Sequence, residues 1–240
     1  MKKSYKNNNP NDMSIIEHLT ELRERLFIAF TLFCIITIIC FIYIKDISSI
    51  LQQPALGIKF LQLAPGEYLF VSIKIALYTG LIVSSPFSIY QIMLFIIPGL
   101  TKKETSYIIP TLIASIILFF IGILFSYKIL VPAALNFLIN YGSEIVEPIW
   151  SFEEYFNFIL LLLFSTGICF QIPIIQIILG YFKILSSNDM LKKWKYIIFI
   201  STIIGAIVTP STDPITQLFM TIAIFILYLS GIFILKILNK

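Results

Sequence analysis

Charge is scarce in this sequence. Only 12% of the 240 residues are Asp, Glu, Lys or Arg, which is about half the share found in soluble domains. Hydrophobic residues make up 58% of the chain, and the mean hydropathy is +0.95. This composition excludes a soluble globular fold and predicts an integral membrane protein with one domain's worth of chain.

Side chains that carry catalysis are also scarce. The chain has one histidine, His18, in its N-terminal segment, which leaves no HExxH zinc site and no Ser–His pair inside the membrane. The three cysteines, Cys34, Cys40 and Cys169, lie in apolar runs without metal-ligand or disulfide spacing. No P-loop glycine pattern occurs, and no carboxylate is expected inside a span, where proton relays need one. We therefore expect no enzyme, no ion-coupled pump, no metal and no cofactor.

Long apolar runs dominate the chain. A membrane-spanning helix needs about 20 mostly apolar residues, and six segments are candidates, although the fifth is short and ends in the sequence TPSTDP. We expect an all-α, polytopic membrane protein with a single domain over 1–240 and a disordered tail over 1–14. The expected helices cover about 26–44, 70–97, 107–130, 155–182, 196–209 and 214–235.

The basic residues predict the orientation in the membrane. Six spans place both termini on one side, and of the 17 Lys and Arg residues only Lys45, Lys59 and Lys128 fall on the other side, with Lys74 within the second span. Cytoplasmic loops carry an excess of such residues, so both termini are expected to face the cytoplasm or a plastid stroma. The two external loops, 45–69 and 131–154, are expected to form partly helical caps.

A patch of both charge signs precedes the first apolar run. Glu17, Glu21 and Arg25 recur one helical turn apart, and Glu21 and Arg25 are in the favourable order for an intrahelical ion pair. One interpretation is an interfacial amphipathic helix with solvated or self-paired charges. The other is a carboxylate placed to bind a cationic ligand near the membrane surface, since a carboxylate accepts an arginine in a bidentate fork.

Two loops carry further polar residues. In FIIPGLTKKE, Phe95 and Pro98 end a helix and Glu104 follows. This is either a helix stop with a solvated loop, or a second carboxylate on the same membrane face as the charged patch. In VTPSTDP, Asp213 precedes Pro214 and is suited to cap the last helix.

Prolines and one amide interrupt the apolar runs. Pro86, Pro110 and Pro173 fall in three different spans, and kinked helices favour a concave bundle. Gln171 lies deep in the fourth span, where an amide is costly unless it forms hydrogen bonds. It either satisfies backbone groups that Pro173 leaves without a partner, or it faces a polar cavity within the protein.

Four motifs occur in order along the chain: HLTELRERL, SSPFSIYQIMLFIIPGLTKKE, FSTGICFQIPI and TPSTDPITQ. With six spans and both termini inside, the chain resembles the TatC family, the receptor subunits of the twin-arginine protein translocase, from about Glu17 to its C-terminus. The frequent Ile, Lys, Asn, Phe and Tyr residues have AT-rich codons, which fits a plastid-encoded member. The thylakoid membrane is the expected location, and a bacterial inner membrane is the alternative.

The resemblance implies a function without covalent chemistry. Proteins of this family recognise signal peptides with an Arg-Arg pair and help to move folded cargo across the membrane, driven by the proton-motive force. They work with single-span TatA- and TatB-type partners, as homo-oligomers within a larger complex, and bind no nucleic acid. A small-solute transporter or channel remains the alternative function.

The resemblance also assigns roles to individual residues. The signal-peptide motif of the family falls on Glu21, Arg23, Arg25, Phe95, Pro98 and Glu104. Pro54 and Asp213 match positions in external loops, and the family would place partner helices near Thr209. Gln171 matches an intramembrane polar position that is Glu in some members, so here only a hydrogen-bonding role is expected.

Overall fold

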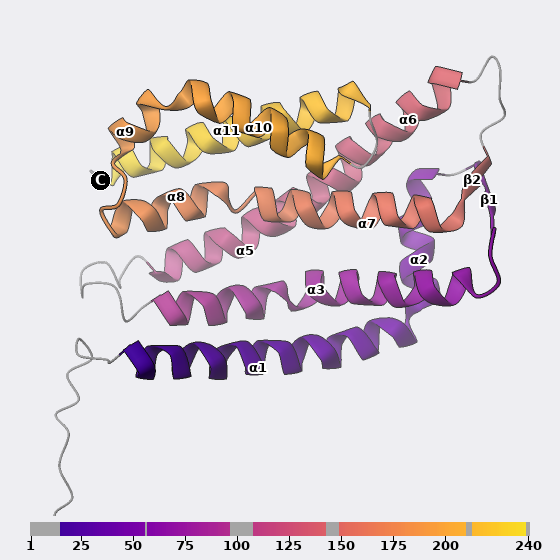
Figure 1. Ribbon diagram of the computed structural model, residues 1–240, viewed down its shortest axis with the longest axis horizontal. Helices are drawn as coiled ribbons and strands as arrows, with labels where there is room; N and C mark the ends of the chain where they lie inside the picture. The colour runs from indigo at the N-terminus through magenta and orange to yellow at the C-terminus, as the bar shows by residue number, and fades with distance from the viewer. Residues whose placement is uncertain (1–14, 56, 97–107, 143–148, 210–212, 239–240) are drawn as a thin grey trace, which may run out of the picture.

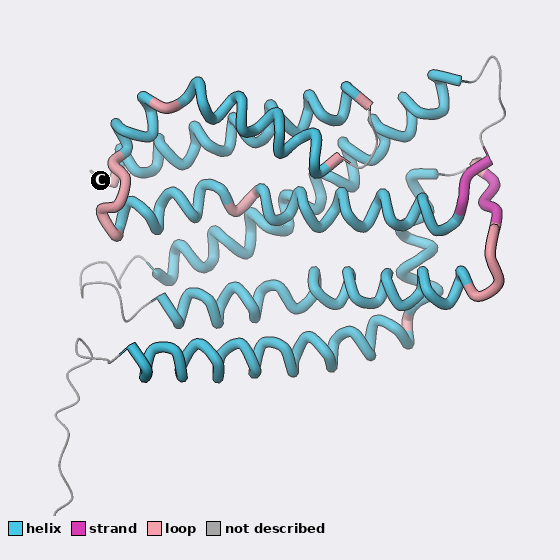
Figure 2. The backbone as a smooth tube through the Cα atoms, viewed as in Figure 1, coloured by secondary structure: helices cyan, strands magenta, loops and turns pink. Residues whose placement is uncertain are grey.

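The computed structural model describes residues 15–55, 57–96, 108–142, 149–209 and 213–238. These residues form a bundle of long, roughly side-by-side helices with a small two-stranded sheet at one end (Figure 1; Figure 2). The expected tail over 1–14, Pro98 and Glu104 lie outside the described residues.

The expected all-α fold with six spanning segments is confirmed. Five segments are long and apolar enough to cross a membrane, and a sixth helix of 15 residues is shorter. At about 1.5 Å per residue, that helix is about 22 Å long and does not cover the ~30 Å hydrocarbon layer. The helices of the six segments are α1 (Ile15–Ile42), α3 (Glu67–Ile96), α5 (Ile108–Phe125) with α6 (Val131–Gly142), α7 (Phe152–Cys169) with α8 (Ile172–Tyr181), α10 (Trp194–Val208) and α11 (Pro214–Ile237). The short helix α9 (Ser187–Lys192) precedes α10.

The first helix begins much earlier than expected. The apolar run predicted a helix from about residue 26, but α1 begins at Ile15 and includes the whole charged patch. Leu, Glu and Arg are good helix formers, and the ion pair between Glu21 and Arg25 supports the same turn. The charged patch is therefore a rigid extension of the first span.

Two of the long spans are interrupted. A π-helical turn over Ser126–Leu130 separates α5 from α6, and the fourth span breaks between α7 and α8, where Pro173 lies in the first turn of the new helix. Pro86, by contrast, lies inside the continuous helix α3, and Pro110 lies in the first turn of α5, where proline is tolerated. Of the three prolines expected to kink a span, only Pro173 lies at a break.

The external loops build a cap with a parallel ribbon that the sequence did not predict. Helix α2 (Ile44–Gln52) and a 3₁₀ turn (Gln53–Ala55) follow α1. Strand β1 (Lys59–Leu61) then pairs in parallel with β2 (Ile149–Ser151). Figure 2 shows this ribbon at one extremity of the bundle. We call this extremity the cap end.

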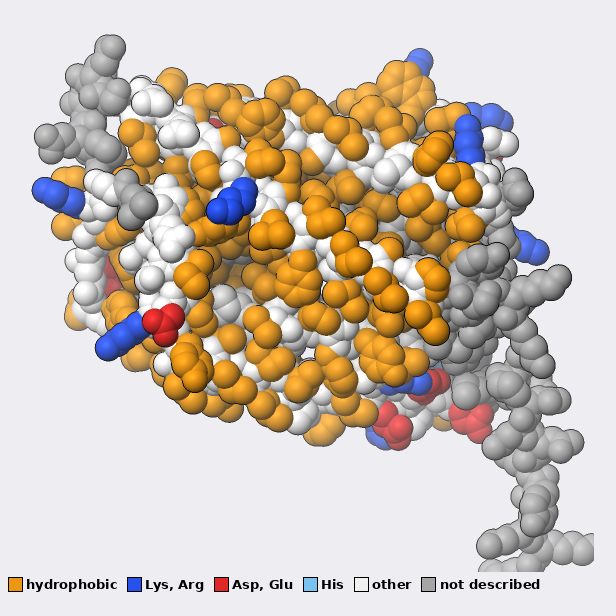
Figure 3. Space-filling model, turned by 180° about the vertical axis from the view of Figure 1, so that it is seen from behind, with side chains coloured by type: hydrophobic (Ala, Val, Ile, Leu, Met, Phe, Trp, Pro, Cys, Tyr) orange, Lys and Arg blue, Asp and Glu red, His pale blue; other side chains and the backbone are white. Residues whose placement is uncertain are grey.

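The other extremity carries the start of α1 and the end of α11 (Figure 1), and we call it the terminal end. Hydrophobic side chains cover most of the middle of the face seen in Figure 3, and most charged side chains lie toward the two ends. This distribution suits a protein whose middle is surrounded by lipid.

The core of the bundle surrounds α7. Residues of α7 such as Phe156 and Ile159 are fully buried, together with Val71 of α3, Leu130 of the π-helical turn and Met220 of α11. In the most apolar stretch of the fourth span 56% of the residues are buried, against 6% in that of α1. Helix α1 packs mainly along α3 and leaves the rest of its surface open to the membrane.

Candidate functional site

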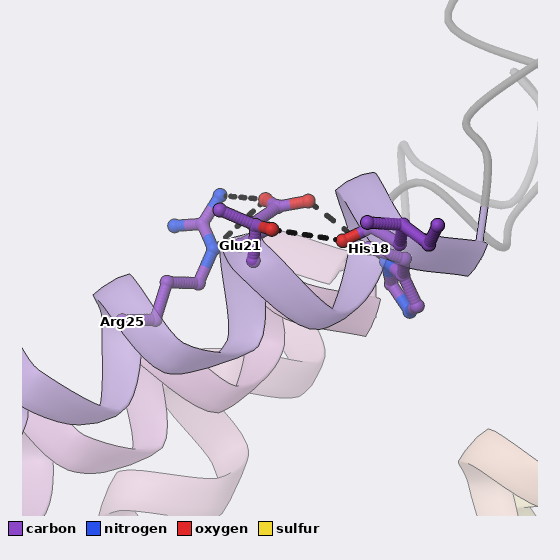
Figure 4. A network of polar contacts seen from close by, with 5 residues as sticks. His18, Glu21 and Arg25 are labelled. Carbon is purple, nitrogen blue, oxygen red and sulfur yellow. Dashed lines mark hydrogen bonds and ion pairs between the residues drawn. The ribbon is translucent and has the colours of Figure 1, made fainter.

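The charged patch of α1 holds a guanidinium on a carboxylate. Arg25 Nε donates a hydrogen bond of 2.9 Å to Glu21 Oε1, and Arg25 Nη2 donates to the same oxygen. The other carboxylate oxygen of Glu21, Oε2, is buried and accepts no hydrogen bond from the described residues. His18 Nδ1 lies 3.9 Å from Oε2. Figure 4 shows the Glu21 carboxylate between the other two side chains.

His18 connects this patch to α3. Its imidazole ring stacks on Phe95, with 4.2 Å between the ring centroids and 13° between the planes. Phe95 lies in the last turn of α3, so the structure brings together two of the segments that the family resemblance assigns to signal-peptide binding. The sequence identified His18 only as the single histidine and assigned it no role. Its place in the first motif was the available signal.

The two arginines of the patch differ in their contacts. Arg25 pairs with Glu21, whereas Arg23 is exposed and forms no ion pair with the described part of the chain. Pro98 and Glu104 lie outside the described residues. The helices on either side of them, α3 and α5, respectively end and begin at the terminal end (Figure 1).

Gln171 connects two spans. Its Nε2 donates a hydrogen bond of 3.0 Å to the backbone oxygen of Ser115 in α5, and its Oε1 accepts one from the Ser115 hydroxyl. Ser115 is 1% exposed. Among the described residues, the amide is therefore used in a reciprocal helix–helix contact and not in repair of the backbone beside Pro173.

Asp213 and Thr209 stand at the turn between α10 and α11. Asp213 is buried, and its Oδ2 accepts a hydrogen bond of 2.9 Å from Thr216 N, as an N-cap does. Thr209 is 5% exposed, and its hydroxyl donates to Gly205 O over 2.9 Å. Thr209 therefore caps the end of α10 and Asp213 caps the start of α11. The buried Thr209 side chain offers little surface to a partner.

Pro54 belongs to the cap end, where it is half-buried in the 3₁₀ turn after α2. Two tyrosines from other spans donate hydrogen bonds to the last backbone carbonyls of α2. The Tyr127 hydroxyl donates to Ile50 O over 2.7 Å, and the Tyr155 hydroxyl donates to Leu51 O over 2.6 Å. The last carbonyls of a helix have no partner within it, so these bonds anchor the cap.

Glu67 is a buried carboxylate that the sequence assigned to an external loop. It is 4% exposed and begins α3. Its oxygens accept backbone hydrogen bonds from Leu63 (2.6 Å), Ala64 (3.0 Å) and Glu153 (2.9 Å). The expectation that no span holds a buried carboxylate is wrong at this position. Glu67 joins the starts of α3 and α7.

A second polar contact between the same helices lies farther along the span. Lys74 Nζ of α3 donates to Glu153 Oε1 over 2.6 Å and to Asn157 Oδ1 over 3.0 Å, both on α7. Both charged side chains are 39% exposed. The sequence placed Lys74 within the second span without a partner.

These features define a class of protein. In the described ranges no three His, Cys, Asp or Glu side chains gather as metal ligands. The polar contacts tie helices together, and the candidate site is a partly exposed carboxylate at one end of a multi-pass helical bundle. A receptor or scaffold embedded in a membrane fits this arrangement.

The comparisons with known proteins identify the family. The family model described as Sec-independent protein translocase protein (TatC) matches residues 17–222. The chain therefore belongs to the TatC family and is a component of a Sec-independent protein translocase.

Relatives come from algae, cyanobacteria and plants. The tatC-like protein ycf43 of Gracilaria tenuistipitata var. liui is 72% identical, over 95% of this chain and 96% of that protein. The Sec-independent protein translocase protein TatC of Synechocystis sp. is 48% identical, over 95% and 90%. The chloroplastic TATC of Pisum sativum is 46% identical, over 95% of this chain and 65% of that protein.

Solved structures share the fold. A crystal structure of the twin-arginine translocase receptor TatC matches with a TM-score of 0.82 and 37% identity, over 93% of this chain and 100% of that one. The chain is thus a multi-pass membrane protein with the six-span fold of this family, whose members are translocase receptor subunits and not enzymes. The plastid and chloroplast relatives support a location in the thylakoid membrane.

Proposed function

We propose that this chain binds twin-arginine signal peptides at its terminal end. With TatA- and TatB-type single-span partners, it transports folded proteins across the thylakoid membrane using the proton-motive force. Membership of the TatC family and the similarity to a solved twin-arginine translocase receptor support this function.

One observation supports the binding site most directly. Glu21 already holds the guanidinium of Arg25, and its second oxygen has no hydrogen-bond donor among the described residues. A guest arginine can replace Arg25, and a rotation of the Glu21 side chain would bring the buried second oxygen within its reach. A hydrogen bond to a charged group contributes about 1.5–3 kcal/mol, and less where water screens it. Because the Glu21 side chain is 20% exposed, the screening is partial.

Glu104 is the proposed second acceptor. It belongs to the connection between α3 and α5, whose described ends lie at the same end of the bundle as Glu21 (Figure 1). Two carboxylates on separate segments would bind the two guanidinium groups of an Arg-Arg pair. Pro98 belongs to the same connection, and Phe95, which precedes it, supports the patch through its stacked contact with His18.

A crosslinking assay with matched variants tests the site. A precursor with a photoreactive group beside its Arg-Arg pair is expected to attach to the start of α1, and a Lys-Lys precursor is not, because lysine lacks the bidentate fork. Glu21→Gln should lower the yield about tenfold or more.

Glu24→Gln is the matched control. It makes the same charge change on an exposed side chain of the same helix, and the yield should stay at the wild-type value. Equal attachment of the Lys-Lys precursor, or an equal loss in Glu24→Gln, would contradict the proposed site.

The partner helices are proposed to dock along α10. This helix is short, and Phe199, Ile203 and Ile207 are exposed on it (68%, 44% and 73%). Since Thr209 itself is buried, the contact should come from these exposed side chains. A cysteine at Ile203 should form a disulfide with a cysteine in a TatA- or TatB-type helix, and a cysteine at the buried Ser201 should not. The reverse result would place the partner elsewhere.

A further inference from the structure

An apolar groove runs between α1 and α3 from the terminal end toward the middle of the bundle. It has a volume of about 530 Å³, within the range of sites that hold small molecules. Its walls are formed by Phe27, Phe30, Phe33, Leu81, Ile92 and Phe95. Phe27 and Phe30 are 70% and 59% exposed, so the groove opens toward the membrane.

The rim of this groove is cationic. Arg23 and Arg25 line it at the terminal end, and Glu21 does not. Arg23 is exposed and has no ion-pair partner in the described part of the chain. Arg25 gives Nε and Nη2 to Glu21 and keeps Nη1 for another acceptor. Gln91 lies about one helical turn below Phe95, lines the groove and makes no side-chain hydrogen bond with described residues.

We propose that this groove binds an anionic diacyl lipid from the membrane leaflet at the terminal end. The negative headgroup lies at Arg23 and Arg25, since arginine donors match phosphate and similar oxyanions. The Gln91 amide donates to an ester oxygen below the headgroup. One acyl chain lies along the phenylalanines of α1.

The length of the groove agrees with one leaflet. From Arg23 to Phe33 the helix advances by ten residues, or ~15 Å at 1.5 Å per residue. One leaflet contributes about half of the ~30 Å hydrocarbon layer, again ~15 Å. A lipid with its headgroup at the arginines therefore places its acyl chain along the whole apolar part of the groove.

The charge of the rim distinguishes this occupant from a signal peptide. Arg25 already pairs with Glu21, whereas Arg23 has no ion-pair partner among the described residues. The charge of Arg23 attracts a negative headgroup and disfavours a leader that carries its own arginine pair. The groove shares Arg23, Arg25 and Phe95 with the residues that the family resemblance assigns to signal-peptide binding. The two proposals are tested by different variants, because peptide binding rests on Glu21 and lipid binding rests on Arg23 and the groove.

Quenching by brominated lipids tests the proposal. The full chain with Phe30→Trp is placed in phosphatidylcholine nanodiscs that contain phosphatidylglycerol, with bromine on the chains of one lipid or the other. The introduced tryptophan should be quenched more strongly by brominated phosphatidylglycerol than its share of the bilayer predicts. Phe41→Trp, outside the groove on the same helix, should show no such preference. The unsubstituted chain supplies the background of Trp150 and Trp194.

Arginine variants complete the test. Arg23→Gln breaks no ion pair with described residues and should lower the preference about fivefold. Arg23→Lys should retain most of it, and Lys195→Gln, which removes a charge from α10, should leave it unchanged. The proposal is overturned if both lipids quench the tryptophan of Phe30→Trp equally, or if Arg23→Gln keeps the preference for phosphatidylglycerol. It is also overturned if an Arg-Arg signal peptide, and not the lipid, occupies the groove, so that added peptide shields that tryptophan from quenching and the lipid shows no preference.

Discussion

The two ends of the bundle are held by different polar and aromatic contacts. At the cap end, Glu67 accepts three backbone hydrogen bonds and two tyrosines complete the last turn of α2. At the terminal end, the His18 ring of α1 stacks on Phe95 of α3, and the carboxylate of Glu21 keeps an oxygen without a hydrogen bond among the described residues. The cap end is a rigid scaffold, whereas the start of α1 at the terminal end keeps polar capacity for a ligand.

Burial follows the same contrast. The fourth span passes through the core, whereas α1 lies at the side of the bundle with 6% of its most apolar stretch buried. Segments with few buried contacts open most readily. Helix α1 can therefore adjust to a ligand at the terminal end while the cap end holds its position.

The largest expected effect is at Glu67. Glu67→Ala empties a buried position and removes the acceptor of three backbone N–H groups, and donors left without a partner destabilise the fold. We expect this substitution to cause a larger fall in thermal stability than any other single change proposed below, measured by unfolding in detergent. Glu154→Ala, an exposed carboxylate at the same end, should unfold at the wild-type temperature. Equal unfolding temperatures for the two variants would show that the cap end does not depend on Glu67.

The two tyrosines give the next effect and compare burial directly. Tyr155→Phe leaves a buried carbonyl without its donor and should cost about 1–3 kcal/mol. Tyr127→Phe removes the same kind of bond at a more exposed position and should cost about 0.5–1 kcal/mol. Denaturant unfolding measures both. If Tyr127→Phe is the more costly, burial does not determine the strength of the cap.

The next expected effect concerns the contact between Gln171 and Ser115, which lies within the spans. A double-mutant cycle with Gln171→Ala and Ser115→Ala should give a coupling energy of about 0.6 kcal/mol, and at most about 1.7, as for other hydrogen bonds between membrane helices. The measurement is unfolding in detergent or bicelles. A coupling energy of zero would mean that the amide is used elsewhere, such as toward a cavity.

The smallest expected effect is at the terminal end. His18→Ala removes a ring stack worth about 0.5–1 kcal/mol. Because α1 packs mainly against α3 and little of it is buried, hydrogen exchange should rise in its first turns and stay unchanged at the cap end. Phe41→Ala, which removes an aromatic ring from the other end of α1, is the control. A change that spread to the cap end would contradict the separation of the two regions.

The sequence predicted the spans well and the contacts between distant segments poorly. Runs of apolar residues define a helix within one segment, which is why six spans, the short fifth one and the cap by Asp213 follow from local patterns. The parallel ribbon between β1 and β2 joins loops that are about 90 residues apart in the chain. Such a pairing is decided by packing, and strands of three residues carry no clear local signal.

The candidate site shows the same division. The sequence placed Glu21 and Arg25 in the favourable order for an ion pair and left open whether the carboxylate pairs with Arg25 or binds a ligand; the structure shows the pair. The stacking of His18 on Phe95 was not expected, since it depends on how α1 lies against α3. Glu104 and Pro98 stay predictions, as they lie outside the described residues.

The sequence by itself determined that this chain resides in a membrane, where its spans lie and which end carries most of its basic residues. Each of these properties depends on the transfer of single segments between water and lipid. Only the tertiary structure decided that Glu67 is buried, that Gln171 bonds Ser115 and that a groove with an arginine rim lies between α1 and α3. Those properties depend on which helices become neighbours, and the packing of side chains from distant segments determines that.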